Sequence, residues 1–343
     1  MSIILEYSFI VFLLLSLNHA MLKKGILLDV PLVNSHKNKK FLSKKVPKSL
    51  GLILLLFILY KTNFDISEKI FLSLFFFLGI QSDTNKLNSP NHRILLQVFM
   101  VIVFLLVSGE YINSTRIPLV DSLLQNFFFK MFLTLICMVI IINGSNFIDG
   151  LSTLCIGYYL GVFVVLYFIT NNNYDISYLR VEIINICWMI LILYFFNLLG
   201  TSFLGDSGSY LLGFLTSIVL IKIHNLLPDI SPWLIAVLLW YPAFEVLFSI
   251  IRRFGVKYNP LFPDNRHLHQ MIFLKFKDKI LLKKNIMNPL VSNIINIYNF
   301  SLFYIAYNFY KNTKILICLF LFSCFIYIVF YVLLSKKLKN NHL

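Results

Sequence analysis

Charged residues are scarce in this sequence. Only 13% of its 343 residues are Asp, Glu, Lys or Arg, about half the share of a soluble globular domain. In their place 59% are hydrophobic, and 35 are phenylalanine. The hydrophobic residues form solid runs long enough to cross a bilayer, which excludes an ordinary soluble domain. Short alternating strands are lacking too, so we expect an all-α, polytopic integral membrane protein.

Cysteine and early basic residues are also scarce. The five cysteines all lie in apolar segments, without a close pair that resembles a metal site, so we interpret them as small core residues. The first apolar run carries Glu6 and is followed by Lys23 and Lys24. This order is the reverse of a cleavable signal peptide, so we expect the first run to be a membrane span.

The apolar runs predict eleven transmembrane helices in one membrane-embedded domain that covers residues 1–343. Three of them are short for a span, and Lys48, Lys61 and Lys69 are expected to snorkel at their ends. The approximate ranges are 3–22, 46–62, 67–81, 94–107, 127–142, 151–169, 181–199, 208–226, 232–250, 290–309 and 314–335.

Positive charge is in excess, with 30 Lys and Arg against 15 Asp and Glu. We attribute the excess to cytoplasmic loops and anionic lipid headgroups, and we expect no nucleic-acid partner. Placing the N-terminus outside puts 22 of the 30 basic residues on the inner side, with eight in loop 23–48 and nine in loop 251–289. The positive-inside rule therefore predicts a periplasmic N-terminus and a cytoplasmic C-terminus.

With this topology four polar segments face the cytoplasm together. They follow the third, fifth, seventh and ninth spans, and they are Ser82-Asp83, Asn143–Gly150, Gly205–Ser209 and Pro263–Gln270. Strongly polar groups between membrane-grade runs are costly and usually functional, although Asn143–Gly150 also has the composition of a plain turn. We expect the four segments to build a single site at the helix ends.

Three carboxylates, Asp83, Asp149 and Asp206, are the candidate catalytic residues. The loops that bear Asp149 and Asp206 hold no Lys or Arg, so their charge invites a divalent cation. Hard oxygen ligands with room for phosphate oxygens indicate Mg²⁺, or Mn²⁺ in its place, at Asp206 and Asp83. Simpler interpretations stay open, with Asp83 as a solvated helix-end acid and Asp206 as a helix N-cap.

The loop after the ninth span supplies the opposite charge, with Arg266 followed by His267 and His269. Histidines two positions apart share a face only on extended backbone, so we expect a loop or strand there. A zinc site and a solvated basic loop are the alternatives to phosphate contact, which we favour as the functional role. Acidic metal ligands beside a basic loop suit the transfer of a phosphoryl group.

Three motifs occur in order along the chain: Asn143-x-x-Asn146-x-x-Asp149-Gly150, Gly205-Asp206-Ser207-Gly208-Ser209-x-x-Leu212-Gly213 and Pro263-Asp264-x-x-His267-Leu268-His269. Together they resemble the polyprenyl-phosphate N-acetylhexosamine-1-phosphate transferases, the MraY/WecA-like glycosyltransferase family 4. Weaker echoes are Asp29–Pro31, Pro47–Gly51 and Pro242–Glu245. The resemblance covers residues 29–270 and assigns no chemistry to the last two spans, within 290–335.

The resemblance implies an enzyme that joins the sugar phosphate of a UDP-N-acetylhexosamine to undecaprenyl phosphate and releases UMP. It implies a site on the cytoplasmic face of a bacterial inner (plasma) membrane, in contact with membrane lipids, and it is compatible with a homodimer. Asp206 would ligate Mg²⁺, Asp83 would act near the lipid phosphate, and Asp149 would line the nucleotide-sugar site. The implied substrate-binding residues are Asn143, Asn146, Asn197, Phe203, Arg266, His267 and His269.

The chain departs from the family pattern at four positions. Ser82 replaces a second acid beside Asp83, Ser152 replaces an acid after Asp-Gly-Leu, and Thr201 and Gln270 replace a lysine and a third histidine. These changes favour a transferase that initiates a cell-surface glycan of the O-antigen or lipopolysaccharide type over the peptidoglycan-precursor enzyme. An inactive scaffold that binds polyprenyl phosphate and a membrane transporter are the alternative functions. Polar motifs at helix ends, without an internal repeat, argue against the transporter.

Overall fold

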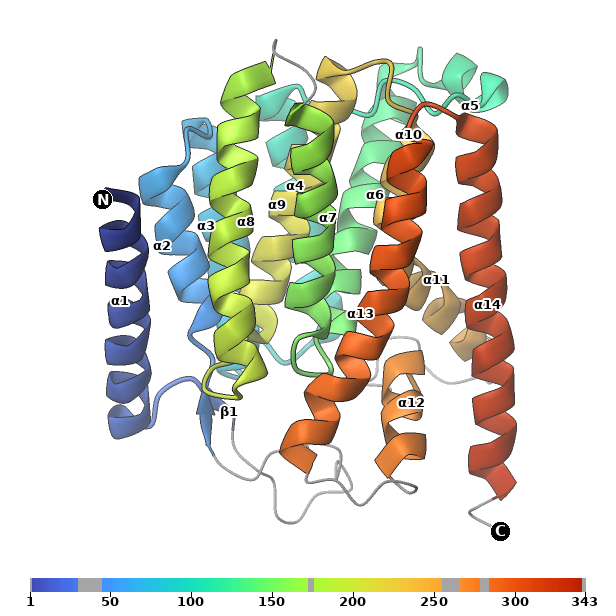
Figure 1. Ribbon diagram of the computed structural model, residues 1–343. Helices are drawn as coiled ribbons and strands as arrows, with labels where there is room; N and C mark the ends of the chain where they lie inside the picture. The colour runs from blue at the N-terminus through green and yellow to red at the C-terminus, as the bar shows by residue number, and fades with distance from the viewer. Residues whose placement is uncertain (1, 30–44, 172–175, 255–265, 278–283, 341–343) are drawn as a thin grey trace.

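The chain forms a bundle of helices that run up and down beside one another, shown in Figure 1 as a computed structural model. It describes residues 2–29, 45–171, 176–254, 266–277 and 284–340. The long helices are α1 (Ser2–Lys24), α2 (Leu50–Lys61), α3 (Ile66–Asp83), α4 (Pro90–Ser108), α6 (Phe127–Ile148), α7 (Leu154–Asn171), α8 (Ser177–Leu198), α9 (Gly205–Leu226), α11 (Trp240–Phe254), α13 (Lys284–Asn308) and α14 (Thr313–Asn340). The shorter elements are α5 (Pro118–Leu123), α10 (Pro232–Leu238), α12 (Leu268–Lys277) and the antiparallel strand pair β1 (Leu28–Asp29) and β2 (Val46–Pro47).

Every run that the sequence predicts as a span coincides with a helix, and the ninth coincides with two, α10 and α11, which meet at 72°. Among the described residues, seven helices are long and apolar enough to cross a membrane, or eight if that bent pair is one span. The count of eleven spans and the orientation of the termini therefore stay predictions. The helical fold class is confirmed, and the two-residue strands are a small addition to it.

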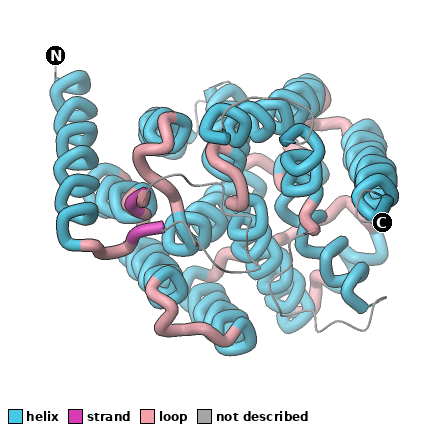
Figure 2. The backbone as a smooth tube through the Cα atoms, turned by 90° about the horizontal axis from the view of Figure 1, so that it is seen from below, coloured by secondary structure: helices cyan, strands magenta, loops and turns pink. Residues whose placement is uncertain are grey.

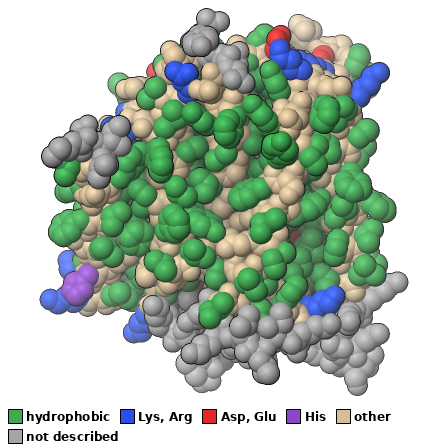
Figure 3. All heavy atoms as spheres, in the orientation of Figure 1, with side chains coloured by type: hydrophobic (Ala, Val, Ile, Leu, Met, Phe, Trp, Pro, Cys, Tyr) green, Lys and Arg blue, Asp and Glu red, His purple; other side chains and the backbone are tan. Residues whose placement is uncertain are grey.

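Hydrophobic side chains cover the middle of the molecular face in Figure 3, while the charged ones gather near its two ends. The outer helices supply this apolar surface, for example through Phe12 on α1 and Phe325 on α14, which are 66% and 63% exposed. Such an apolar belt is the surface expected of a membrane-embedded protein. Cys137 and Cys318 also lie on exposed positions, so the prediction that all cysteines are core residues is wrong for these two.

The central helix is α9. In its most apolar stretch 83% of the residues are buried, against 17% in that of α1 and 22% in that of α14, which lie on the outside. Helices approach it closely because glycines face it: a Cβ on Gly79 of α3 would lie 2.2 Å from the Ser207 Cα, and one on Gly51 of α2 would lie 2.7 Å from the Gly208 Cα. Small residues at such crossings allow backbones to touch. The first turn of α9 is therefore wedged directly against two neighbouring backbones.

Local signals explain where the helices near this wedge begin and end. Asp65 and Glu68 form a reciprocal capping box at the start of α3. Ser89 accepts from the His92 N–H at the start of α4, whose first residue is a proline. α4 ends at Gly109 with φ 67°, a left-handed conformation that favours glycine.

Three helices, α3, α6 and α8, end on the side of the bundle where α9 begins. We call this side the site end, and it is the lower end in Figure 1 and the side viewed in Figure 2. Short hydrogen bonds link the helix termini there, including one from Asn146 near the end of α6 to Asp206 in the first turn of α9. The alternation of helix direction thus brings polar segments from distant parts of the sequence to one place.

Candidate active site

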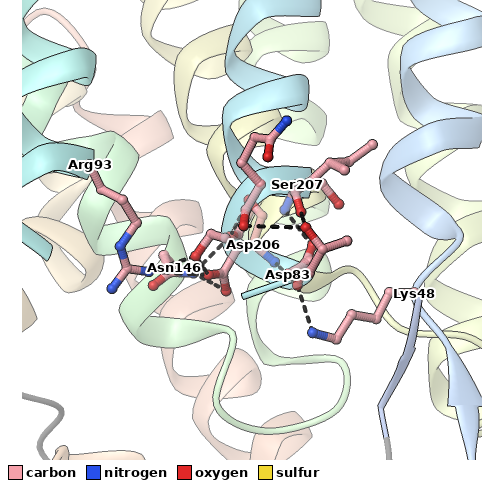
Figure 4. A network of polar contacts seen from close by, with 11 residues as sticks. Lys48, Asp83, Arg93, Asn146, Asp206 and Ser207 are labelled. Atoms are coloured by element: carbon pink, nitrogen blue, oxygen red, sulfur yellow. Dashed lines mark hydrogen bonds and ion pairs between the residues drawn. The ribbon is translucent and has the colours of Figure 1, made fainter. Parts of the chain in front are cut away.

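Asp83, the last residue of α3, holds the N-terminus of α9. Its two carboxylate oxygens accept from the backbone N–H groups of Asp206 and Ser207, at 3.1 and 3.0 Å, and Lys48 Nζ lies 2.6 Å from Oδ1 (Figure 4). The Asp83 side chain is 0% exposed. A carboxylate is stabilised at a helix N-terminus because free N–H groups and the helix dipole both favour an anion. Gly205, with φ 70°, leaves room for this approach, since a Cβ there would lie 2.7 Å from Asp83 Oδ2.

Asp206 projects from the same turn into a ring of donors. Its Oδ1 accepts from Asn146 Nδ2 at 2.8 Å, and its Oδ2 accepts from Ser82 Oγ at 2.5 Å. Arg93 Nη1 lies 3.5 Å from that Oδ2 and donates to Ser82 Oγ at 2.6 Å. The Asp206 side chain stays 30% exposed, so it is the carboxylate of this cluster that a solvent-borne ligand can reach.

Asn143 and Asp149 lie on either side of Asn146 along α6. Asn143 Nδ2 donates to Gln97 Oε1 at 2.7 Å, so it connects α6 with α4 and not with Asp206. Asp149 caps the end of α6 and is half-buried. Burial raises the pKa of the Asp149 carboxyl well above its usual range, and the nearby carboxylates of Asp206 and Asp83 raise it further.

Two of the predicted substrate-binding residues, Asn197 and Phe203, lie at the end of α8 and in the loop that follows it. Asn197, at the end of α8, is buried; its Oδ1 accepts from the Thr153 N–H and its Nδ2 donates to the Ser202 carbonyl at 3.1 Å. Phe203 lies between α8 and α9, and its N–H donates to the Pro47 carbonyl at 2.9 Å. Both residues are thus at the site end, one holding a turn and the other joined to the strand β2.

A buried cluster on α11 and α12 adjoins the end of α6. Glu245 Oε2 lies 2.9 Å from His267 Nδ1, and Tyr241 Oη lies 3.2 Å from His269 Nδ1. Phe147 contacts His267 with 4.9 Å between ring centroids. Burial lowers the pKa of His269 and so favours its neutral imidazole. The nearby Glu245 carboxylate acts in the opposite direction but does not outweigh burial. His269 Nε2 is buried without a hydrogen-bond partner among the described residues, and a Cβ on Gly150 would lie 2.6 Å from it.

The histidines differ from their predicted backbone. His267 precedes α12, but His269 lies in its first turn, so the expectation of a loop or strand is wrong for His269. Their rings nevertheless stack, with 5.6 Å between centroids and 10° between planes, because the pair spans the start of the helix. Arg266 is exposed beside them. Residues 255–265, which include Pro263 and Asp264 of the motif, lie outside the described residues, as do Val30 and Pro31.

The residues fit Mg²⁺ at one carboxylate. Among the described residues, no group of three or more His, Cys, Asp and Glu side chains could enclose a metal ion. Mg²⁺ that binds together with substrate phosphates needs only one or two protein carboxylates, and the accessible Asp206 has the required hard oxygens. Asp83 is less suited, because its buried oxygens already accept from Lys48 and two backbone N–H groups. Its role as a metal ligand stays a prediction, and its contacts favour a role in positioning α9.

Several residues that the fold brings to the site had no predicted role in it. Lys48 and Glu245 stood in the weaker motifs, and Arg93 stood at the start of the fourth predicted span. The signal for all three was a charged residue in or beside a membrane-grade run. The asparagines of α13, which contact the turn at Thr153, carried no motif.

The comparisons with known proteins point in one direction. Residues 68–224 match the family model described as glycosyl transferase family 4. This segment contains Asp83, the Asn143–Gly150 motif and the Gly205–Gly213 motif. His267 and His269 lie beyond it.

Curated relatives are similar at low identity. A probable undecaprenyl-phosphate N-acetylglucosaminyl 1-phosphate transferase of Bacillus subtilis (strain 168) is 24% identical over 274 residues, which cover 77% of this chain and 76% of that protein. An undecaprenyl-phosphate alpha-N-acetylglucosaminyl 1-phosphate transferase of Escherichia coli (strain K12) is 27% identical over 154 residues, 42% of this chain and 41% of that protein. One of the same name from Thermotoga maritima is 38% identical over 81 residues, 23% of this chain and 26% of that protein.

The matched segment supplies Asp83, Asn146 and Asp206, the side chains that the fold gathers around the N-terminus of α9. Motifs, geometry and similarity therefore agree on the resemblance of this chain to glycosyl transferase family 4.

Proposed function

We propose that this protein transfers N-acetylhexosamine 1-phosphate from a UDP-sugar to undecaprenyl phosphate, and that the transfer takes place at the site end. An oxygen of the lipid phosphate attacks the phosphorus that carries the sugar. A new P–O bond forms, the bond between this phosphorus and the bridging oxygen breaks, and UMP leaves with that oxygen. The observation that carries the proposal is that the ends of α3 and α6 meet the first turn of α9 at Asp206, whose carboxylate stays accessible.

The proposed cofactor is Mg²⁺, or Mn²⁺ in its place, held by Asp206. Bound there, the ion supplies neutralisation of the phosphate oxygens whose charge opposes the attack. Asn146 and Ser82 donate to the Asp206 carboxylate and fix its direction. The fixed orientation supports catalysis because a metal ligand held by neighbouring donors keeps its geometry.

Two cations lie within reach of the same phosphates. Lys48, in the loop between β2 and α2, lies beside Asp83, and Arg93, on α4, lies beside Asp206; both extend toward the site in Figure 4. A guanidinium binds phosphate oxygens in a bidentate manner, and an ammonium binds them as a point charge. In the proposed complex Lys48 and Arg93 stabilise the negative charge of the substrate phosphates, which the carboxylates of the site alone would repel. Arg266, His267 and His269 would hold the diphosphate or sugar from the side of α12.

The proposed setting is a bacterial plasma membrane with the site end facing the cytoplasm. The bias of basic residues toward the loops on that side supports it. The product, an undecaprenyl diphosphate sugar, would start a cell-surface glycan of the O-antigen or lipopolysaccharide type.

A direct assay tests the reaction. Protein purified in detergent is incubated with undecaprenyl phosphate, Mg²⁺ and one UDP-N-acetylhexosamine at a time, and UMP release is measured. We expect turnover with at least one donor, its loss in EDTA, and a drop of roughly 10²-fold or more in Asp206→Asn. Asp229→Asn, the same substitution at an exposed acid at the opposite end, is the matched control and should keep its activity.

Two results would contradict the proposal. The first is full turnover in EDTA or in Asp206→Asn, which would remove the carboxylate from the reaction. The second is tight binding of undecaprenyl phosphate without UMP release for any donor, the behaviour of an inactive scaffold.

A further inference from the structure

Helix α13 lies outside the matched family segment, yet one of its faces is polar. Asn288, Ser292, Asn296 and Asn299 follow one another at helical spacing, and Asn293 lies beside them. Ser292, Asn296 and Asn299 are buried, so this face points into the bundle. Polar side chains are costly within a membrane protein unless they find partners there.

The partners of three of these asparagines lie in one turn, Gly150–Thr153, between α6 and α7. Asn288 Oδ1 accepts from the Ser152 N–H at 2.9 Å. Asn293 Oδ1 accepts from Thr153 Oγ1 at 3.2 Å, and Asn296 Nδ2 donates to the Thr153 carbonyl at 3.0 Å. Asn197 of α8 completes the set by accepting from the Thr153 N–H. The N–H, hydroxyl and carbonyl of Thr153 are therefore all fixed by asparagine side chains.

Thr153 needs such support because its backbone is strained. Its φ is 68°, a left-handed value that a β-branched residue rarely adopts. Conformations of this kind persist only where the surroundings impose them, and they cluster at functional sites. The strained turn directly follows Asp149, whose pKa is raised by burial and by the nearby acids of the site, and its first residue, Gly150, lies against His269. The four asparagines that hold this turn, which we call the clamp, therefore set where the end of α6 meets both α9 and α12.

We propose that Asn288, Asn293 and Asn296 of α13 are positioning residues for the nucleotide-sugar site. They act through the Gly150–Thr153 turn and are not themselves catalytic. The inference rests on the proposed function for the identity of the ligand, and on the hydrogen bonds above for its mechanism. Tyr194 of α8 strengthens the arrangement, because its hydroxyl donates to the same Asn293 Oδ1 at 2.9 Å.

A simpler role for the polar face is to hold helices together within the membrane, as interhelical hydrogen bonds do. Asn299 has that role: its Oδ1 accepts from Trp240 Nε1 at 3.0 Å, away from the turn. It therefore provides the matched control. The two roles differ in what they predict, because loss of packing lowers stability alone while loss of positioning weakens binding of one substrate.

The test uses the full chain in detergent with three variants, Asn293→Leu, Asn293→Asp and Asn299→Leu. For each, KM for UDP-N-acetylglucosamine and for undecaprenyl phosphate, kcat, thermal stability and direct calorimetric binding of UDP-N-acetylglucosamine are measured. Asn293→Leu removes the acceptor of two hydroxyl groups and should raise KM and Kd for the nucleotide sugar roughly tenfold, with KM for the lipid unchanged. Asn293→Asp keeps an oxygen acceptor and should restore most of the affinity. Asn299→Leu should leave both KM values as in the wild type.

The inference is wrong if Asn293→Leu keeps wild-type affinity for the nucleotide sugar, or if it weakens both substrates equally. It is also wrong if Asn299→Leu reproduces the effect. A wild-type protein that binds UDP-N-acetylglucosamine without turnover would contradict the proposed reaction alone, and the Kd values would still decide the role of α13. A wild-type protein that does not bind the nucleotide sugar would overturn both.

Discussion

Replacing Gly79 by alanine would drive a methyl group into the first turn of α9. The new Cβ would lie 2.2 Å from the Ser207 Cα and 2.6 Å from the Asp206 carbonyl oxygen. Both are backbone atoms, so a side-chain rotation cannot relieve the clash. Ordinary contact begins at 3.4 Å, and the turn has to move by about 1 Å or more.

This displacement acts on the hydrogen bonds from Asp206 N and Ser207 N to Asp83, now 3.1 and 3.0 Å long. A shift of about 1 Å takes both beyond hydrogen-bonding distance. Overpacking of this kind costs about 1–3 kcal/mol of folding stability. The larger effect is on the reaction, because misplacement of a reacting group by ~1 Å lowers rates by ~10²-fold. We therefore expect Gly79→Ala to fold with reduced stability and to lose nearly all turnover.

Gly161→Ala is the control for overpacking alone. Its Cβ would meet the Phe300 ring at 2.3 Å, a comparable clash between the middle of α7 and α13, which a side-chain rotation can relieve. The assay is UMP release per folded protein, with folding monitored by thermal denaturation in detergent. We expect Gly161→Ala to lose stability and keep its specific activity. Wild-type specific activity in Gly79→Ala would refute the argument that this contact positions Asp206.

Two further substitutions test the acids. Asp83→Asn breaks a buried ion pair with Lys48, so it should cost about 3–5 kcal/mol of stability and abolish turnover at every pH, and recovery at alkaline pH would show instead that Asp83 serves as a base. Burial and nearby acids raise the pKa of Asp149, so the folded state binds a proton there more tightly than the unfolded state does. The contribution of this proton to folding stability should be fully present below about pH 4 and should be lost as the pH rises through the folded pKa. Asp149→Asn mimics the protonated form, so thermal denaturation should show it to be more stable than the wild type at pH 7 but not at pH 3. If the variant and the wild type are equally stable at both pH values, the raised pKa is not the cause.

Much of the architecture could be predicted from the sequence because apolar runs of membrane length impose helices. Backbone polar groups have no water to bond with in a bilayer, so a helix satisfies them internally. The predicted ranges therefore coincide with helices from α1 to α14. The predicted boundaries agree less well with the observed ones where a helix is short, as for α2, or where a span is bent, as for α10 and α11. Length and composition alone do not determine where a polar helix end stops crossing the membrane.

The candidate site was predictable in its members more than in their contacts. Asp83, Asn146 and Asp206 were recognisable as polar residues at helix ends, and the fold brings all three within one hydrogen-bonded cluster. Their individual roles were not predictable, because a carboxylate has the same sequence signal whether it caps a helix or holds a metal. Burial separates the two cases: Asp83 is fully covered and bound by three donors, whereas Asp206 remains accessible.

The sequence by itself determined that the chain is helical, that it belongs in a membrane, and that its polar motifs gather at helix ends. Composition and the spacing of apolar runs act locally, so they can be read along the chain. Only the tertiary structure decided which N–H groups Asp83 accepts from, where Arg93 points, and that α13 clamps Thr153. These contacts join residues separated by as many as 143 positions. Their geometry depends on glycine-mediated helix crossings and on one strained turn, which local patterns do not specify.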